Sequence, residues 1–196
     1  MRNLLMLLAA SAAVAIPSAA SAQRAPAAVV VLVDTNKVYN DCNACKTAQA
    51  QFQAQATAAQ NRQKTLAAQL QPEHEAIQKA IDALNGKQPD AALKTRIEAY
   101  QKKSEDAQQE VARAEQNLQS VRANIIRQID VKFGPAVSQV MAQQGANIAV
   151  DMEGTIAHGP GTDVTAAVLA ALNSSLTSIS ATALPQQAQQ QQPQGR

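Results

Sequence analysis

The feature that most constrains this chain is a short break, residues 84–90, between two long stretches of helix-forming residues. Ala, Gln, Leu, Lys and Glu dominate both sides of the break, and these residues lose little free energy on entering a helix. Within the break, Asn85 and Gly86 tolerate the left-handed backbone that ends a helix. Pro89 suits the first position of the next helix, and Asp90 suits the positive end of its dipole. The sequence therefore predicts an antiparallel helical hairpin over residues 46–143.

Both predicted arms carry residues at alternating steps of four and three, which is the spacing of a coiled-coil seam. The downstream seam consists of Leu93, Ile97, Tyr100, Ser104, Ala107, Val111, Ala114, Leu118, Val121 and Ile125. The upstream seam is thinner, with several small and two polar members, and consists of Phe52, Ala56, Ala59, Gln63, Leu66, Leu70, Glu73, Ile77, Ala80 and Leu84. Pro72 is expected to kink or restart the first arm, and Gly134-Pro135 to bend the second. At about 1.5 Å per residue, the hairpin would extend on the order of 60 Å.

Residues 1–22 have the features of a secretory signal peptide. Arg2 gives a positive start, an apolar run follows from Leu4 to Ile16, and residues 20–22 are the small residues of a cleavage site. The apolar run is too short for a transmembrane anchor and ends at Pro17. We therefore expect cleavage near Ala22 and a mature protein that is soluble in an oxidising compartment.

Charge and aromatic content limit what the mature chain can be. The 196 residues include 17 Lys and Arg against 15 Asp and Glu, a balance that argues against nucleic-acid binding, which needs a clustered basic surface. Only 2% of the residues are aromatic. A chain so poor in large apolar side chains cannot fill a thick globular core. We therefore expect an extended helical molecule that completes its burial by oligomerising.

Two segments flanking the hairpin, residues 23–45 and 144–173, are expected to form a small β/α body. The uniformly apolar run Val29–Val33 predicts a strand covered on both faces, followed by a short helix capped by Asp34 or Thr35. Residues 146–151 and 154–158 predict a second and a third strand. A closing helix begins after Asp163 and carries Val164, Val168, Leu169 and Leu172 on one face.

These strands can meet only if the hairpin brings its two ends together. Three short strands bury little surface alone, so strands from several copies are expected to pool. From Ser174 the chain is rich in Ser and Thr and then in Gln, so residues 174–196 are expected to be disordered. The predicted fold class is α+β, mostly α, with a long antiparallel hairpin on a small β body.

The order of these parts resembles the Skp/OmpH family of periplasmic chaperones. Residues 29–39 are similar to the family's opening strand and helix, and residues 146–169 to its closing strands and D-[IV]-T-x-x-[VI]-[LI] helix. The resemblance covers roughly residues 28–172. It implies a homotrimer in which three hairpins enclose a cavity for unfolded outer-membrane proteins, without ATP, catalytic residues or cofactors.

The resemblance also implies roles for particular side chains. The trimer body would include Val29, Val31, Val33, Ile148, Val150 and Ile156. The arm residues that serve the seam or contact a client would be Phe52, Leu66, Leu70, Ile77, Leu84, Leu93, Ile97, Tyr100, Val111 and Leu118. Basic and acidic residues alternate along the arms here, unlike the strongly basic arms typical of the family. Because the charges alternate, we expect at most weak contact with a membrane surface or lipopolysaccharide.

Cys42-x-x-Cys45 is the one chemically reactive motif in the sequence. An oxidising compartment favours a local structural disulfide, which would fix how the first arm leaves the body. The alternatives are redox exchange and pairing between chains, and redox exchange would be accompanied by a thioredoxin-type βαβ pattern, which is absent. A metal site would need two more ligands, and His74 and His158 are far along the chain. Asp151, Glu153 and Asp163 are interpreted as turn and capping residues.

Three functions follow from these features. The leading hypothesis is an ATP-independent periplasmic holdase for unfolded outer-membrane proteins. The alternatives are a structural coiled-coil adaptor or spacer of the envelope, and a thiol oxidoreductase that uses Cys42 and Cys45.

Overall fold

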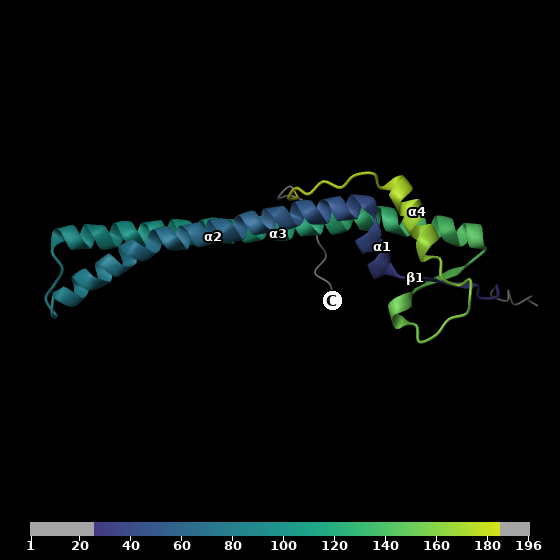
Figure 1. Ribbon diagram of the computed structural model, residues 1–196, viewed down its shortest axis with the longest axis horizontal. Coiled ribbons are helices and arrows are strands. Elements are labelled where there is room, and N and C mark those ends of the chain that lie inside the picture. The colour runs from purple at the N-terminus through teal and green to yellow at the C-terminus, as the bar shows by residue number, and fades with distance from the viewer. Residues whose placement is uncertain (1–25, 185–196) are drawn as a thin grey trace, which may run out of the picture.

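The computed structural model describes residues 26–184 and shows a long helical hairpin projecting from a small body (Figure 1). The elements in chain order are β1 (Val30–Val33), α1 (Thr35–Asp41), α2 (Asn43–Ala83), α3 (Ala91–Gln144), β2 (Ile148–Asp151), a 3-10 helix (Met152–Gly154) and α4 (Thr165–Ser175). The predicted fold class, a mostly helical α+β chain built on a hairpin, is confirmed. The predicted signal peptide and the Gln-rich residues 185–196 lie outside the described residues.

The turn between α2 and α3 follows the backbone chemistry of its residues. Asn85 and Gly86 have φ angles of 46° and 85°, the left-handed conformation expected after a helix. The Asp90 carboxylate then accepts a hydrogen bond from the Leu93 backbone N–H at 2.8 Å and caps α3. Because Asp90 is the cap, Pro89 precedes the helix, and its predicted place at the first helical position is wrong.

The two arms pack through the predicted seams. Every seam residue is buried or half-buried except Gln63, which is exposed. Ile77 on α2 and Ala107 on α3 are among the most buried, at 6% and 9% exposure. Both helices continue through Pro72 and Pro135, so Pro72 does not restart the first arm. Toward the turn, α2 diverges from α3 (Figure 1).

The two strands form a parallel pair in which Val30 lies opposite Ile148 and Val33 opposite Asp151. A parallel pair needs a long crossover connection, and here the connection includes the whole hairpin. On the other edge of β1, the Leu32 N–H donates to the Thr162 carbonyl at 2.8 Å, and the Val164 N–H donates to the Leu32 carbonyl at 2.9 Å. The sheet is thus extended by a single bridge and not by a third regular strand.

The predicted third strand over residues 154–158 is wrong. The Asp151 carboxylate accepts a hydrogen bond from the Glu153 N–H at 2.9 Å and turns the chain into the 3-10 helix directly after β2. Residues 155–158 are therefore irregular, and Ile156 is fully exposed. The chain returns to β1 only at residues 162–164.

The core lies where the hairpin meets the body. Val38 of α1, Val140 of α3, and Val168 and Leu172 of α4 are at most 1% exposed and pack in one cluster with Val31, Val33 and both cysteines. Most of these side chains are small or β-branched, so the core is compact but thin. The body therefore has little apolar volume of its own.

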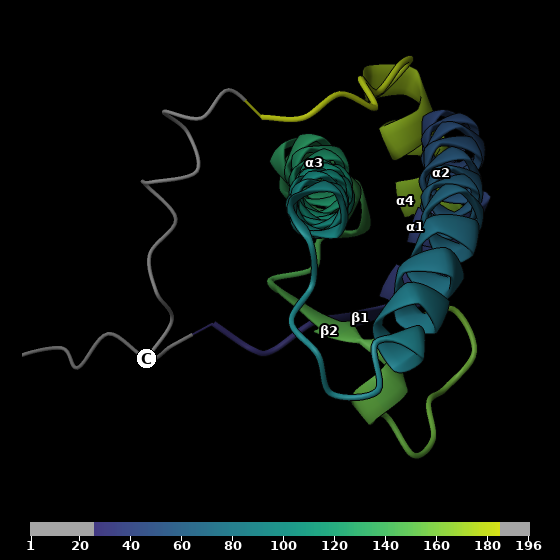
Figure 2. The ribbon, with the colours of Figure 1, turned by 90° about the vertical axis from the view of Figure 1, so that its left-hand side faces the viewer.

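The segment that follows α4 is packed and not disordered, so the prediction of disorder is wrong for residues 174–184. Ser174 and Ser175 belong to α4, and residues 176–184 run along the hairpin (Figures 1 and 2). Leu176, Ile179 and Ala181 are buried at 6%, 9% and 9% exposure. The Ser/Thr-rich composition concealed these spaced apolar residues.

Tyr39 joins α1 to α3. Its hydroxyl donates a hydrogen bond to the Asp130 carboxylate at 2.7 Å, and its ring contacts Phe133 edge-on with 5.2 Å between ring centroids. Partial burial raises the pKa of Tyr39 above its ordinary value, and the bond to Asp130 raises it further.

We predict that Tyr39→Phe lowers the free energy of unfolding by about 1 kcal/mol at neutral pH, because the partly exposed hydrogen bond to Asp130 is lost. Above about pH 10 the unfolded chain releases the tyrosine proton while the folded chain keeps it, so the contribution of this hydrogen bond falls as pH rises. Urea unfolding of both proteins at neutral and alkaline pH measures the difference. A difference that stays constant across this range would contradict the account.

Candidate functional site

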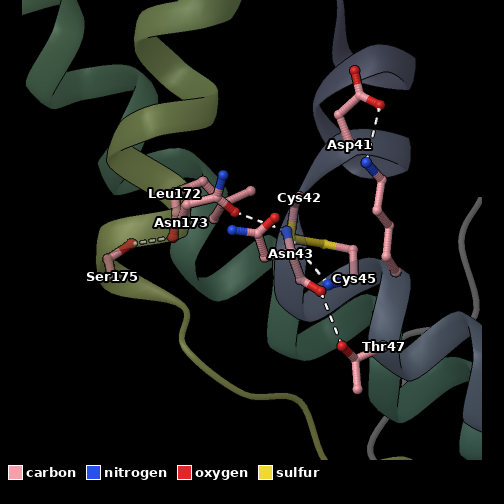
Figure 3. The surroundings of a disulfide bond; sticks show 9 residues. Asp41, Cys42, Asn43, Cys45, Thr47, Leu172, Asn173 and Ser175 are labelled. Atoms are coloured by element: carbon pink, nitrogen blue, oxygen red, sulfur yellow. Dashed lines mark hydrogen bonds and ion pairs between the residues drawn. A yellow bond between two sulfur atoms is a disulfide. The ribbon is translucent and has the colours of Figure 1, made fainter.

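Cys42 and Cys45 form a disulfide at the point where α1 ends and α2 begins (Figure 3). Both residues are buried, at 0% and 4% exposure. The Cys45 N–H donates to the Cys42 sulfur at 3.2 Å, and the Asn43 N–H donates to the Asn173 side-chain oxygen of α4 at 2.8 Å. This junction ties the start of α2 to the body and sets the direction in which the hairpin leaves it.

The burial of this disulfide disfavours thiol exchange, since exchange requires an attacking thiolate to reach a sulfur atom. Within residues 26–184, no group of three His, Cys, Asp or Glu side chains could hold a metal ion. His74 lies on the hairpin, with its ring 5.7 Å from that of Tyr100. His158 lies in the loop of the body and contacts the Gly159 carbonyl at 3.2 Å.

The acidic residues of the body hold turns together. The Asp151 carboxylate has a pKa below its ordinary value because the Thr35 side chain and the Glu153 N–H both donate to it. Hydrogen bonds from the Thr165 hydroxyl and N–H lower the pKa of Asp163 in the same way. The Asp151 carboxylate thereby connects β2 to α1, and the Asp163 carboxylate binds the first residue of α4.

One face of the sheet is apolar and partly open. Residues opposite one another in a parallel pair share a face, so Val30, Leu32, Ile148 and Val150 lie on one side, away from the core residues Val31 and Val33. Leu32 is covered, at 5% exposure, whereas Val30, Ile148 and Val150 are 39%, 42% and 41% exposed. Of the residues predicted for a trimer body, Val31 and Val33 lie inside the protomer, whereas Val29, Ile148, Val150 and Ile156 are exposed.

The outer edge of β2 adds to this open face. Among the described residues, β2 pairs only with β1, so the backbone groups on its other side have no strand partner. An exposed edge beside exposed Val and Ile side chains is a surface that soluble proteins normally cover. The sheet is therefore the part of the body best suited to association.

The arms of the hairpin leave shallow grooves between them. Leu66, Leu70 and Val111 line one groove with a volume of about 370 Å³. Leu84 and Leu93 line a second groove near the turn, and Phe52 lines a third near the base. The remaining predicted arm residues, Ile77, Ile97, Tyr100 and Leu118, lie buried or half-buried in the seam.

Ion pairs join the arms on either side of the first groove. Arg62 donates to both oxygens of Glu110 at 2.6 and 3.0 Å, and Arg96 donates to Glu73 at 2.6 Å. These hydrogen bonds hold the pKa values of Glu110 and Glu73 below their ordinary range. Because all four side chains are partly exposed, the pairs align the arms more than they stabilise them.

Sequence reasoning missed a row of polar side chains on α3. Ser120, Asn124 and Gln128 are spaced by four residues, lie on one face of the helix and bind the backbone of residues 180–184. The regular spacing was visible in the sequence, but it could be interpreted only once the bound segment was known.

Among residues 26–184, none of the helices has both the length and the apolar character needed to cross a membrane.

Comparisons with known proteins agree on one family. The family described as "Outer membrane protein (OmpH-like)" matches residues 29–172. The structure resembles the crystal structure of a candidate outer membrane chaperone (OmpH-like) from Caulobacter crescentus, with a TM-score of 0.67 and 16% sequence identity. The alignment covers 84% of this chain and 95% of the Caulobacter chain. No curated protein matches the sequence.

We predict that reducing the Cys42–Cys45 disulfide lowers the free energy of unfolding by about 2 kcal/mol, because the unfolded chain regains the freedom that the short loop removes. Urea unfolding followed by circular dichroism, with and without reductant, measures this change. The double variant Cys42→Ala/Cys45→Ala is the control, since its stability should not respond to reductant. Equal stability of the oxidised and reduced wild-type protein would show that the disulfide does not brace this junction.

Proposed function

The chain belongs to the OmpH-like family of outer membrane proteins, and we propose that it is an ATP-independent holdase chaperone of the periplasm. In this function it binds unfolded outer-membrane proteins between helical hairpins and keeps them from aggregating. The observation that carries the proposal is the combination of a long, thin hairpin with a body whose sheet leaves an apolar face open. No step of this activity needs a catalytic residue or a cofactor.

The open sheet supports assembly into a homotrimer. Val30, Ile148 and Val150 expose apolar surface beside the unpaired edge of β2, and a neighbouring copy could cover both at once. A cyclic arrangement of three copies would bury this face in a shared centre and leave three hairpins projecting on one side. The thin protomer core explains why such sharing would stabilise the body.

The surface of the hairpin is suited to binding an unfolded client through weak contacts. Its grooves are shallow and lined by side chains of modest size such as Leu66, Leu70 and Val111, so each contact contributes little free energy. Many weak contacts retain an unfolded chain and still allow it to leave without ATP. The interleaved charges of the arms keep the outer surface soluble and give no large field of one sign.

We predict that the mature protein has the mass of three chains in light scattering coupled to size-exclusion chromatography. Ile148→Asp should reduce the mass to one chain, because a buried carboxylate at the shared face is costly. Ile81→Asp is the matched control, since Ile81 is similarly exposed (38% against 42%) but lies near the tip of the hairpin. A single-chain mass for the wild type, or an unchanged mass for Ile148→Asp, would contradict the trimer.

We also predict that the wild-type protein suppresses the light scattering that develops when a urea-unfolded outer-membrane β-barrel is diluted, without ATP and near one trimer per client. Ile148→Asp should lose this activity, because separate protomers cannot enclose a client. Scattering that is unaffected by the wild-type protein would overturn the holdase proposal. Tight binding to a folded envelope protein, without any effect on unfolded clients, would instead support a coiled-coil adaptor.

A further inference from the structure

Residues 176–184, the C-terminal strap, leave the body after α4 and run along the hairpin. Figures 1 and 2 both show this segment beside α3, pointing away from the sheet. The strap forms no helix or strand, yet it is tightly packed at its apolar positions. Ile179 and Ala181 are buried while Ser180 and Thr182 between and after them are exposed, which is the alternation of an extended chain.

Gln128 of α3 binds both backbone groups of one strap residue. Its side-chain nitrogen donates to the Ser180 carbonyl at 3.0 Å, and its side-chain oxygen accepts from the Ser180 N–H at 3.0 Å. An amide side chain thereby replaces the neighbouring strand that an extended segment would have in a sheet. This contact uses no atom of the Ser180 side chain.

Further side chains bind the strap in the same way. Asn124 donates to the Thr182 carbonyl at 3.0 Å, and Gln55 of α2 donates to the Ala181 carbonyl at 2.9 Å. The Ser120 hydroxyl accepts from the Leu184 N–H at 2.8 Å. Together with Gln128, these residues bind five backbone groups of the strap through two helices. Because every polypeptide carries the same backbone groups, the contacts are independent of sequence.

We propose that Gln55, Ser120, Asn124 and Gln128 form a binding site for extended polypeptide, that the strap fills this site at rest, and that a segment of an unfolded client displaces it. The displacement step rests on the proposed chaperone function, whereas the binding site does not. The preferred ligand is an extended segment with small or apolar residues at alternate positions, as in the strands of outer-membrane β-barrels.

The strap is suited to being exchanged. Its hydrogen bonds are each modest in net effect, and they are offset by the conformational entropy lost when nine residues are ordered. Its connection to α4 nevertheless gives it a high effective concentration at the site. The apparent affinity of a competing segment is therefore its intrinsic affinity multiplied by the fraction of time that the strap leaves the site free.

The test measures binding of a fluorescent peptide of residues 177–184 to a protein that ends at Leu176 and so keeps only the first, buried residue of the strap. Fluorescence anisotropy should show binding to the shortened protein and binding roughly tenfold weaker to the full chain, whose own strap competes. A protein that ends at Leu184 is the control for the loss of residues 185–196 and should behave like the full chain. Equal peptide binding by the shortened and full-length proteins, or none by either, would overturn the proposal.

Two substitutions in α3 of the shortened protein test the site itself. Gln128→Ala should weaken peptide binding by roughly tenfold, because both hydrogen bonds to Ser180 are lost. Gln101→Ala, which changes an exposed glutamine on the opposite face of α3, should leave binding unchanged. If shortening the chain unfolds the helices, full-length Ser180→Pro decides the matter, since proline removes the N–H bound by Gln128 and should expose the site to added peptide.

Addition of an unfolded outer-membrane β-barrel should release the bound peptide from the shortened protein. If the protein suppresses aggregation but the barrel leaves the peptide bound, the displacement step is wrong while the chaperone function stands. If the peptide binds as expected but aggregation is not suppressed, the site stands and the proposed chaperone function falls.

Discussion

The rest of the structure depends on the parallel pairing of β1 with β2, which brings together two ends of a long connection. Val29 and Asn147 are 118 positions apart in sequence, yet the Val29 N–H donates to the Asn147 side-chain oxygen at 2.8 Å, and the Asn147 side chain donates to the Ala27 carbonyl at 2.8 Å. This pairing requires α2 and α3 to return to their starting point and so fixes them as antiparallel arms. The apolar core can then form only where the arms, α1, α4 and β1 converge.

The small side chains of the core, where the arms meet α1, α4 and β1, have consequences for function. The protomer core consists largely of Val, Ala and Cys, so it cannot also cover the outer face of the sheet, where Ile148 and Val150 remain exposed. The arms also have few bulky side chains along their length. Ala at seam positions leaves grooves between α2 and α3, because its side chain is too small to fill the interface. The exposed apolar residues of the sheet and the shallow grooves of the arms both follow from the same shortage of bulky residues, and they are the two properties that the proposed chaperone would use.

Features decided by neighbouring residues could be predicted from the sequence. The turn at Asn85 and Gly86, the place of Asp90 at the N-terminal end of α3 and both seams depend on local backbone preference and on helical period, and the structure contains all of them. The third strand failed because Asp151 turns the chain by bonding the Glu153 N–H, an interaction that competes with strand formation. The strap was missed because Leu176, Ile179 and Ala181 are separated by Ser and Thr, and their burial depends on a surface supplied by two distant helices.

The proposed assembly requires that one chain forms an incomplete sheet and that other copies complete it. Amide hydrogen exchange at residues 148–151, measured over a range of protein concentrations, tests this claim most directly, because these residues form the open edge strand. The account predicts strong protection at high concentration, together with rapid exchange when dilution separates the copies. Protection that is independent of concentration in a protein with the mass of one chain would contradict it.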